Sequence, residues 1–265
     1  MRIPRTFGQY VAVESPVHGL DAKTKMGLMA AHTVALFTVE QFAGLAVAGV
    51  FVVVAVVLAR VPWRLALRGI KAVAVILAFT LIAHALRWNP ATVALLRLGP
   101  LAVDAEGLRT GLFFAARIVL LVVGTSLLTL TTTPVQLTDG LERLMRPLAR
   151  FGFPAGDVAM MLTVALRFIP TTAEEADKII VAQMARGARF DEGSPMRRAK
   201  TYIPVLIPLF VNLFRRADEL AIAMESRCYH GGSGRTRLHP ARMRVGDWAV
   251  LCCGAALLVT LGILL

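Results

Sequence analysis

The sequence has few of the side chains that enzymes and disulfide-bonded proteins use. Its 265 residues include three cysteines, three tyrosines, three tryptophans and five histidines, and 17 acidic residues stand against 29 Lys and Arg. Cys252 and Cys253 are adjacent in an apolar run and Cys228 stands alone, so none has metal-ligand or disulfide spacing. We find no Ser/His/Asp set and no pair of carboxylates in an apolar segment, so we expect no catalytic site, no metal and no cofactor.

The sequence instead contains long apolar runs. Hydrophobic residues make up 57% of the chain and the mean hydropathy is +0.66, against about 45–50% apolar residues in soluble domains. The runs predict an all-α, polytopic integral membrane protein embedded in the lipid bilayer. The net charge of +12 then fits basic loops that face anionic lipid, and no nucleic-acid partner is expected because no stacking aromatics interleave with the basic residues.

Five transmembrane helices are expected. The apolar run that begins at Met26 is too long for one span and is broken only at Glu40 and Gln41, so it predicts two helices joined by a tight hairpin. The N-terminus is not apolar enough for a cleavable signal peptide, so these first spans would direct insertion. The predicted spans are 25–39, 42–59, 69–86, 109–131 and 246 to the C-terminus.

Basic residues set the expected orientation. They cluster before the first span and between the second and third spans. The positive-inside rule places both segments on the cytoplasmic side of the membrane, which is expected to be a bacterial or archaeal cell membrane. The N-terminus is therefore expected in the cytoplasm. The chain would divide into a cytoplasmic N-terminal segment, a four-helix transmembrane region, a cytoplasmic helical region and a final span, at 1–25, 26–131, 132–245 and 246–265.

The cytoplasmic region is expected to contain two amphipathic helices that each end at an arginine. The sequence Thr171-Thr172-Ala173-Glu174 fits a capping box, which predicts a helix from there to Arg186 that stops at Gly187. A second helix would end at Arg227, before the glycine-rich residues 231–234. It carries an apolar stripe at helical spacing, formed by Leu209, Leu213, Leu220 and Met224.

The apolar segment 202–214 is too short to span a bilayer, so it either packs under the transmembrane bundle or lies in the membrane interface. The Gly-rich residues 231–236 resemble a phosphate loop but lack the Gly-Lys-Ser/Thr ending, so a flexible linker is expected. His32 and His84 are read as core histidines, with a proton relay as the alternative. Arg117 is read as structural, with a role in a transport pathway as the alternative.

Each terminal arginine has small neighbours: Ala185 and Gly187 flank Arg186, and Ser226 and Cys228 flank Arg227. Arginines at helix ends often bind lipid headgroups only. The repetition, together with small neighbours that admit a close backbone and a planar fork of five donors, favours docking to a partner protein.

The chain resembles the transmembrane energy-coupling subunit, or T component, of energy-coupling factor transporters, which are ABC-type importers of vitamins and trace nutrients. Three segments carry the resemblance: GQYVAVESPVHGLDAKTK (8–25), AQMARGARF (182–190) and YIPVLIPLFVNLFRRADELAIAMESRCY (202–229). It covers essentially the whole chain. The first segment and the Arg-Cys-Tyr form of the last are more similar to the type shared by several substrate subunits than to the dedicated cobalt or nickel type.

The resemblance implies a non-catalytic subunit with two kinds of partner. Two ABC ATPase subunits would each receive one arginine, Arg186 or Arg227, with its neighbours Ala185, Gly187, Ser226 and Cys228. A small membrane substrate-binding (S) subunit would bind the apolar faces of the coupling helices, for which the stripe Leu209, Leu213, Leu220 and Met224 is the candidate. The second motif differs from Ala-Arg-Gly at both residues beside its arginine. This difference affects how the motif would pack, but the docking arginine itself is present.

Two other classes of function remain open at this point. A membrane-embedded enzyme, such as a lipid-head-group transferase, would need an acidic metal-binding face, and the acids of 174–192 show no repeating ligand spacing. A permease subunit of a conventional ABC importer would form the pathway itself and dimerise. Metal-dependent turnover by the purified chain would favour the first, and a ratio of one chain to two ATPases would argue against the second.

Overall fold

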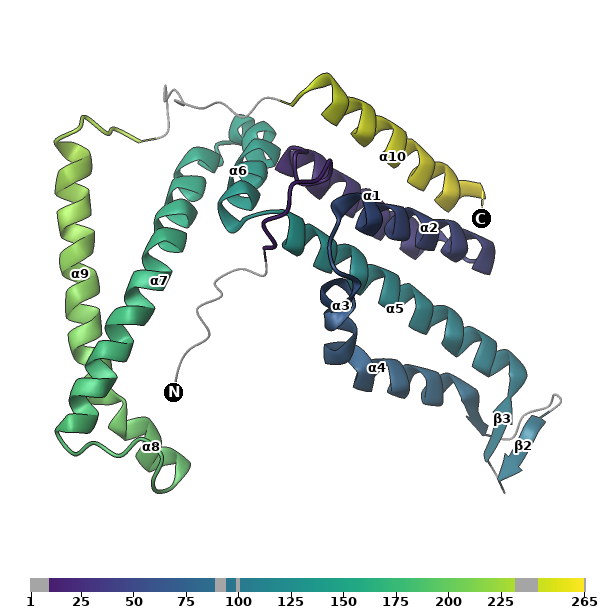
Figure 1. The fold of residues 1–265 in the computed structure, drawn as a ribbon, viewed down its shortest axis with the longest axis horizontal. Coiled ribbons are helices and arrows are strands. Elements are labelled where there is room, and N and C mark those ends of the chain that lie inside the picture. Colours follow the sequence, from purple (N-terminus) through teal and green to yellow (C-terminus); the bar gives the residue numbers. More distant parts are fainter. Residues whose placement is uncertain (1–9, 89–93, 99–100, 232–242, 265) are drawn as a thin grey trace. The chain divides into compact units, whose positions relative to one another are not determined.

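The protein is described from a computed structural model, which covers residues 10–88, 94–98, 101–231 and 243–264. It consists of two compact units. The first comprises Met1–Gly140 and Pro240–Leu265, and the second Leu141–His239. Figure 1 shows a molecule built almost entirely of helices, which confirms the predicted all-α polytopic class. The predicted division of the chain into four parts, with boundaries after residues 25, 131 and 245, is a different division from these two units and stays a prediction.

The first unit contains helices at all five predicted spans: α1 (Ala22–Thr38), α2 (Phe42–Ala59), α4 (Arg68–Ala85), α5 (Ala105–Thr131) and α10 (Val245–Leu264). A one-turn helix, α3 (Trp63–Ala66), precedes α4. Within the described residues, three helical stretches are long and apolar enough to cross a membrane: Phe42–Ala59, Trp63–Ala85 and Ala105–Thr131. The apolar part of α10 is shorter, at Val245–Thr260, and α1 has 17 residues.

Three short strands follow α4 and were not predicted. They are β1 (Leu86–Trp88), β2 (Ala94–Leu98) and β3 (Leu101–Asp104), and they form an antiparallel sheet in the order β1-β3-β2. Leu86 pairs with Val103, and Leu98 pairs with Leu101. Asp104 then caps α5 by accepting a hydrogen bond from the backbone N–H of Glu106.

The core of the first unit lies between α1, α2 and α5. Leu36, Val39, Leu45 and Ala48 pack with Phe113 of α5. A second group contains Val56 of α2, Ala66 of α3 and Val123 of α5. Large apolar side chains on the outer faces are exposed, including Val50, Val75 and Phe79. An apolar outer surface around an apolar core is what lipid contact requires.

Glycine allows α4 and α5 to approach closely. A Cβ added at Gly107 would collide with the backbone oxygen of His84, and one at Gly111 would lie 3.3 Å from the backbone oxygen of Leu81. The two glycines are four residues apart and therefore share one face of α5. Small residues at this spacing are typical of helix pairs that pack in a membrane.

The N-terminal segment is attached to the helices of the first unit by polar groups. The ammonium of Lys25 donates to the backbone oxygens of His18 (3.2 Å) and Thr131 (2.9 Å). Asp247 accepts from the backbone N–H of Asp21 and from that of Arg244. The start of α1, the end of α5 and the start of α10 are therefore held together.

The second unit is built on two long helices, α7 (Ala155–Ala185) and α9 (Ile203–Glu225), linked through α8 (Pro195–Thr201). A 3₁₀ turn, η1 (Arg146–Phe151), precedes α7, and α6 (Pro134–Met145) begins in the first unit and ends in the second. The segment 202–214 forms the start of α9 rather than a separate element.

The predicted start of the first coupling helix is wrong. Thr171 and Thr172 do not cap a helix, because α7 begins at Ala155 and continues through Pro170. A proline inside a helix removes one backbone hydrogen bond and usually kinks or breaks it. Pro170 lies on the exposed side of α7, where water can satisfy the freed carbonyl, so the helix continues.

Candidate functional site

Helices α7 and α9 end in the same backbone arrangement. At the end of α7 the N–H of Gly187 donates to the oxygen of Met184 (2.9 Å), and the N–H of Ala188 donates to that of Gln183 (3.0 Å). This pair of bonds, with a left-handed residue after the last helical one, is a standard way to end a helix. Gly187 supplies the left-handed residue, with φ +91°.

The end of α9 repeats this pattern at each corresponding position. The N–H of Cys228 donates to the oxygen of Glu225 (2.9 Å), and the N–H of Tyr229 donates to that of Met224 (3.0 Å). Cys228 takes the left-handed conformation, with φ +58°, although it has a Cβ. The predicted helix ends at Arg186 and Arg227 are therefore confirmed, and the two arginines occupy equivalent backbone positions.

The six residues of the two motifs are exposed. The C-terminal carbonyls of a helix carry partial negative charge, which favours a cation at this position. Neither guanidinium has a hydrogen-bond or ion-pair partner within the described part of the chain. Each can therefore present its donors to another molecule. The motif residues are Ala185, Arg186, Gly187, Ser226, Arg227 and Cys228.

Helices α7 and α9 run antiparallel, so the two motifs lie at opposite ends of the pair (Figure 1). Gln183 near the end of α7 donates to the oxygen of Pro204 at the start of α9 (3.5 Å). Further along, Glu175 accepts from Asn212. The 23 residues of α9, at 1.5 Å rise per residue, separate the two arginine motifs by about 35 Å.

A polar cluster fixes the register of the pair. Glu175 accepts a hydrogen bond from the Asn212 side chain at 2.9 Å and forms an ion pair with Arg216 at 3.1 Å. These side chains are only partly exposed, so the ion pair is less screened than one on the surface. Sequence analysis missed this cluster, because partners 37 residues apart leave no local signal.

The predicted apolar stripe lies on the side of α9 that packs on α7. Leu209, Leu213, Leu220 and Met224 are half-buried, and they share a helix face with buried Val205 and with Asn212. Their expected contact with a substrate-binding subunit is not tested by this placement and stays a prediction.

A second apolar face of α9 is far more accessible. Phe210 and Phe214 are 54% and 69% exposed, and Ile207, Val211 and Ile222 lie near them on the outer side. Exposed apolar clusters of this kind mark interaction sites. The signal was present in the sequence, because residues 202–214 are apolar on both faces rather than on one stripe.

The intramembrane polar residues are held within the first unit. Arg117 donates to the backbone oxygen of Val39 at the α1–α2 hairpin and lies over the rings of Phe113 (4.8 Å) and Phe114 (5.4 Å). His84 contacts the backbone oxygen of Thr80 at 2.8 Å, and His32 stacks on Phe51. These contacts agree with the structural interpretation of all three.

Two further expectations can be placed only in part. Gly231 has a left-handed φ of +93°, but the rest of the glycine-rich loop lies outside the described residues. Among the residues that the structure describes, no group of three or more His, Cys, Asp or Glu could hold a metal ion.

Comparison with known proteins places the chain in a family. Residues 13–238 match the family model CbiQ, described as a cobalt transport protein. Its relatives include three that are named energy-coupling factor transporter transmembrane protein EcfT. The one from Thermosediminibacter oceani is 45% identical over 96% of this chain and 95% of its own length.

The other two match as broadly. The relative from Heliobacterium modesticaldum is 49% identical over 92% of this chain and 91% of its own length. The relative from Bacillus subtilis is 42% identical over 87% of this chain and 86% of its own length. Each of the three matches covers 86% or more of both chains. The chain therefore belongs to the CbiQ family, as a membrane component similar to the transmembrane proteins of energy-coupling factor transporters.

Proposed function

We propose that this chain transmits ATP-driven motion from two ABC ATPase subunits to a small membrane substrate-binding subunit for the uptake of a vitamin or trace nutrient. The carrying observation is that Arg186 and Arg227 end two helices in the same backbone geometry, at opposite ends of one antiparallel pair. A spacing of about 35 Å, the length of α9, suits two separate partner molecules.

Each arginine has the chemistry of an anchor. The guanidinium is always charged and has five donors in a rigid fork, which suits carboxylates and backbone carbonyls in a groove. Ala185 with Gly187, and Ser226 with Cys228, leave room for a partner backbone to approach. We infer that Arg186 docks into one ATPase subunit and Arg227 into the other.

The antiparallel pair would act as the mechanical link. Glu175 joins α7 to α9 through Asn212 and Arg216, so displacement of one helix end is passed to the other helix. The substrate-binding subunit would contact α9 through its apolar faces. The stripe Leu209, Leu213, Leu220 and Met224 remains the proposed contact, extended by the more exposed side chains around Phe210 and Phe214.

The proposed function also requires a particular orientation in the membrane. The N-terminus and residues 132–245 would lie on the cytoplasmic side of the cell membrane, where ATPase subunits can reach both arginines. The chain itself would have no catalytic role. The energy would come from ATP hydrolysis in the ATPase subunits, and the bound nutrient would be chosen by the substrate-binding subunit.

Substitution of both arginines tests this function. The double variant Arg186→Ala/Arg227→Ala is expected to abolish coupled uptake while reaching the membrane at normal levels. Truncation of an arginine that becomes buried in a partner's groove costs on the order of 2–4 kcal/mol of binding free energy. Arg215 is an exposed arginine of α9. The variant Arg215→Ala serves as the matched control and should transport normally. Normal uptake by the double variant would contradict docking through these residues.

A further inference from the structure

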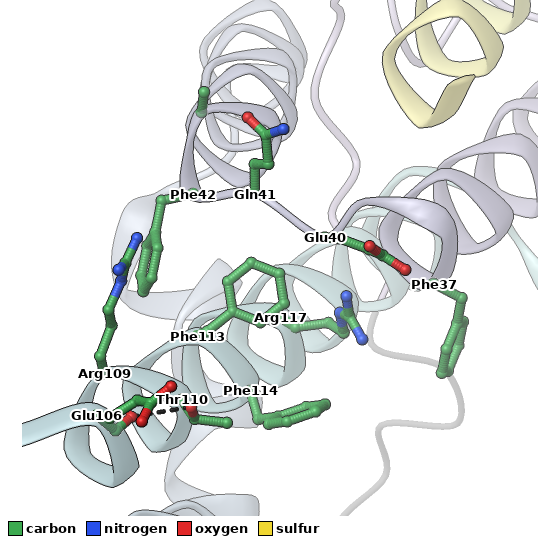
Figure 2. Close-up of a pocket in the computed structure, with 11 residues that line it drawn as sticks. Phe37, Glu40, Gln41, Phe42, Glu106, Arg109, Thr110, Phe113, Phe114 and Arg117 are labelled. Carbon is green, nitrogen blue, oxygen red and sulfur yellow. Dashed lines mark hydrogen bonds between the residues drawn. The ribbon is translucent and has the colours of Figure 1, made fainter. Parts of the chain in front are cut away.

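A hollow of about 710 Å³ lies in the first unit, at the hairpin between α1 and α2 and against the first half of α5 (Figure 2). Four phenylalanines line it: Phe37, Phe42, Phe113 and Phe114. Its other walls carry charge, with two arginines and two glutamates among the lining residues. The docking arginines on α7 and α9 have no part in it, so its role is separate from the function proposed above.

One face of α5 supplies most of the charge. Glu106, Arg109, Phe113 and Arg117 are spaced by three or four residues, so they follow one another along the same side of the helix. The backbone positions of Arg109 and Arg117 are about 12 Å apart along the helix axis. Glu40 faces them from the hairpin, and Figure 2 shows its carboxylate directed toward Arg117.

The arginines are held by aromatic rings rather than by the glutamates. The guanidinium of Arg109 lies 5.6 Å from the centre of the Phe42 ring, and that of Arg117 lies 4.8 Å from the centre of Phe113. Phe42 and Phe113 meet edge to face at 5.2 Å. Each of the two cations therefore lies against one ring of an edge-to-face aromatic pair.

Within the described residues, no close ion pair joins the four charged side chains. Neither Glu40 nor Glu106 forms an ion pair with Arg109 or Arg117, among the contacts of the described residues. Arg117 gives one N–H to Val39, which leaves donors free, since a guanidinium has five. Glu40, Glu106 and Arg109 are exposed, so a ligand can reach them.

The charge pattern selects one class of ligand. Two arginines and two glutamates sum to zero, so a simple anion would meet the carboxylates and a simple cation would meet the guanidiniums. A group with a phosphate and an ammonium satisfies both, because arginine binds phosphate and a carboxylate accepts from N–H donors. The aromatic walls would also attract the ammonium.

The surroundings of the hollow indicate that this group belongs to a lipid. Phe37, which lines the hollow, is 65% exposed, and Val34 of α1 and Leu112 of α5 are 61% and 57% exposed. Apolar side chains beside a charged hollow at the ends of membrane helices match a headgroup with its acyl chains. We propose that this hollow binds the phosphoethanolamine headgroup of a membrane phospholipid. On the orientation proposed above, it would open to the outer leaflet.

Native mass spectrometry of the detergent-purified chain, reloaded with defined lipids, tests the site. The wild type is expected to retain phosphatidylethanolamine at least about tenfold better than phosphatidylglycerol, the effect of one charge-assisted hydrogen bond. Arg109→Gln should lose the preferred lipid, because it removes a phosphate partner. Glu40→Gln should shift the preference toward phosphatidylglycerol, because the lining then carries a net positive charge.

Controls separate this site from general lipid adhesion. Arg64→Gln removes an exposed arginine of α3 outside the hollow and should bind lipid as the wild type does. Unchanged elution and helicity would show that the variants are folded. Equal retention of both lipids, unaffected by Arg109→Gln and Glu40→Gln, would overturn the proposal. Displacement of the lipid by millimolar O-phosphoethanolamine is expected, because the proposal places recognition in the headgroup.

Discussion

Gly187 and Cys228 adopt the same left-handed backbone conformation, each directly after the arginine that ends its helix, with φ of +91° and +58°. Glycine takes this conformation at no steric cost, whereas a residue with a Cβ pays about 1–2 kcal/mol. The two motifs therefore have the same backbone conformation, but the conformation is less stable at Cys228 than at Gly187. The α9 motif holds a strained residue at the point where a partner is proposed to dock.

Cys228→Gly should relieve this strain. The expected gain is about 1 kcal/mol, from removal of the Cβ at a left-handed position. It would appear as slower backbone hydrogen exchange at the end of α9. The matched change Gly187→Ala should cost a similar amount at the end of α7, and a Gly187→Ala variant with unaltered exchange would show that the left-handed turn is not maintained in solution.

Glu175 should couple the two helices. Glu175→Ala leaves Asn212 and Arg216 without their shared partner, with an expected loss of about 1–3 kcal/mol of local stability. Hydrogen exchange along α7 and α9 would report the loosening. A double-mutant cycle with Asn212→Ala measures the coupling energy, and additive effects of the two changes would exclude a direct interaction.

The α4–α5 contact should depend on small residues. Gly111→Leu would drive a side chain into the backbone of Leu81, and overpacking of this kind costs about 1–3 kcal/mol. The thermal midpoint of the detergent-solubilised protein should fall. Gly246→Leu is the control, since a Cβ there meets nothing within 4 Å, and an equal loss in both variants would mean that α4 and α5 are not closely packed.

The stability of the N-terminal segment should fall in mild acid. Burial, and then the positive charge of Lys25, lower the pKa of His18 below its ordinary value of 6.5. Below pH 6.5 the unfolded chain therefore binds more protons at this residue than the folded one, so the free energy of unfolding decreases as the pH falls. Above pH 6.5 the effect is absent.

His18→Gln isolates this contribution. The variant should lose part of the decline in thermal midpoint between pH 7 and pH 5 that the wild type shows. His230, an exposed histidine beyond α9, provides the control as His230→Gln, which should keep the decline. A pH profile of His18→Gln that overlays the wild-type profile would contradict a protonation penalty at His18.

The sequence predicted the features that rest on local rules. The apolar runs gave the positions of the membrane helices, and Gly187 marked the end of α7, because a glycine after a helical stretch favours a left-handed cap. The end of α9 was predicted through its arginine and the glycines that follow. Its left-handed residue, Cys228, was not, because cysteine carries no preference for that conformation.

The features that sequence reasoning missed rest on tertiary contacts. The start of α7 was misplaced because Pro170 normally ends a helix, whereas here the helix continues through it. The Glu175–Asn212 contact needs the antiparallel register of two helices, which no local pattern specifies. The hollow is formed by the α1–α2 hairpin and α5, which are far apart in the sequence: Arg117 of α5 donates to Val39, 78 positions away. The sheet after α4 depends on pairing between strands with weak individual signals.

The number of ATPase subunits bound to each variant shows whether Arg186 and Arg227 each dock one subunit. The tagged chain would be purified from its native membrane in mild detergent, and the complex weighed intact. We expect two ATPase subunits on the wild type and one on Arg186→Ala and on Arg227→Ala alone, because each arginine serves its own subunit. Two ATPase subunits on both single variants and on the double variant would contradict docking by these helix ends.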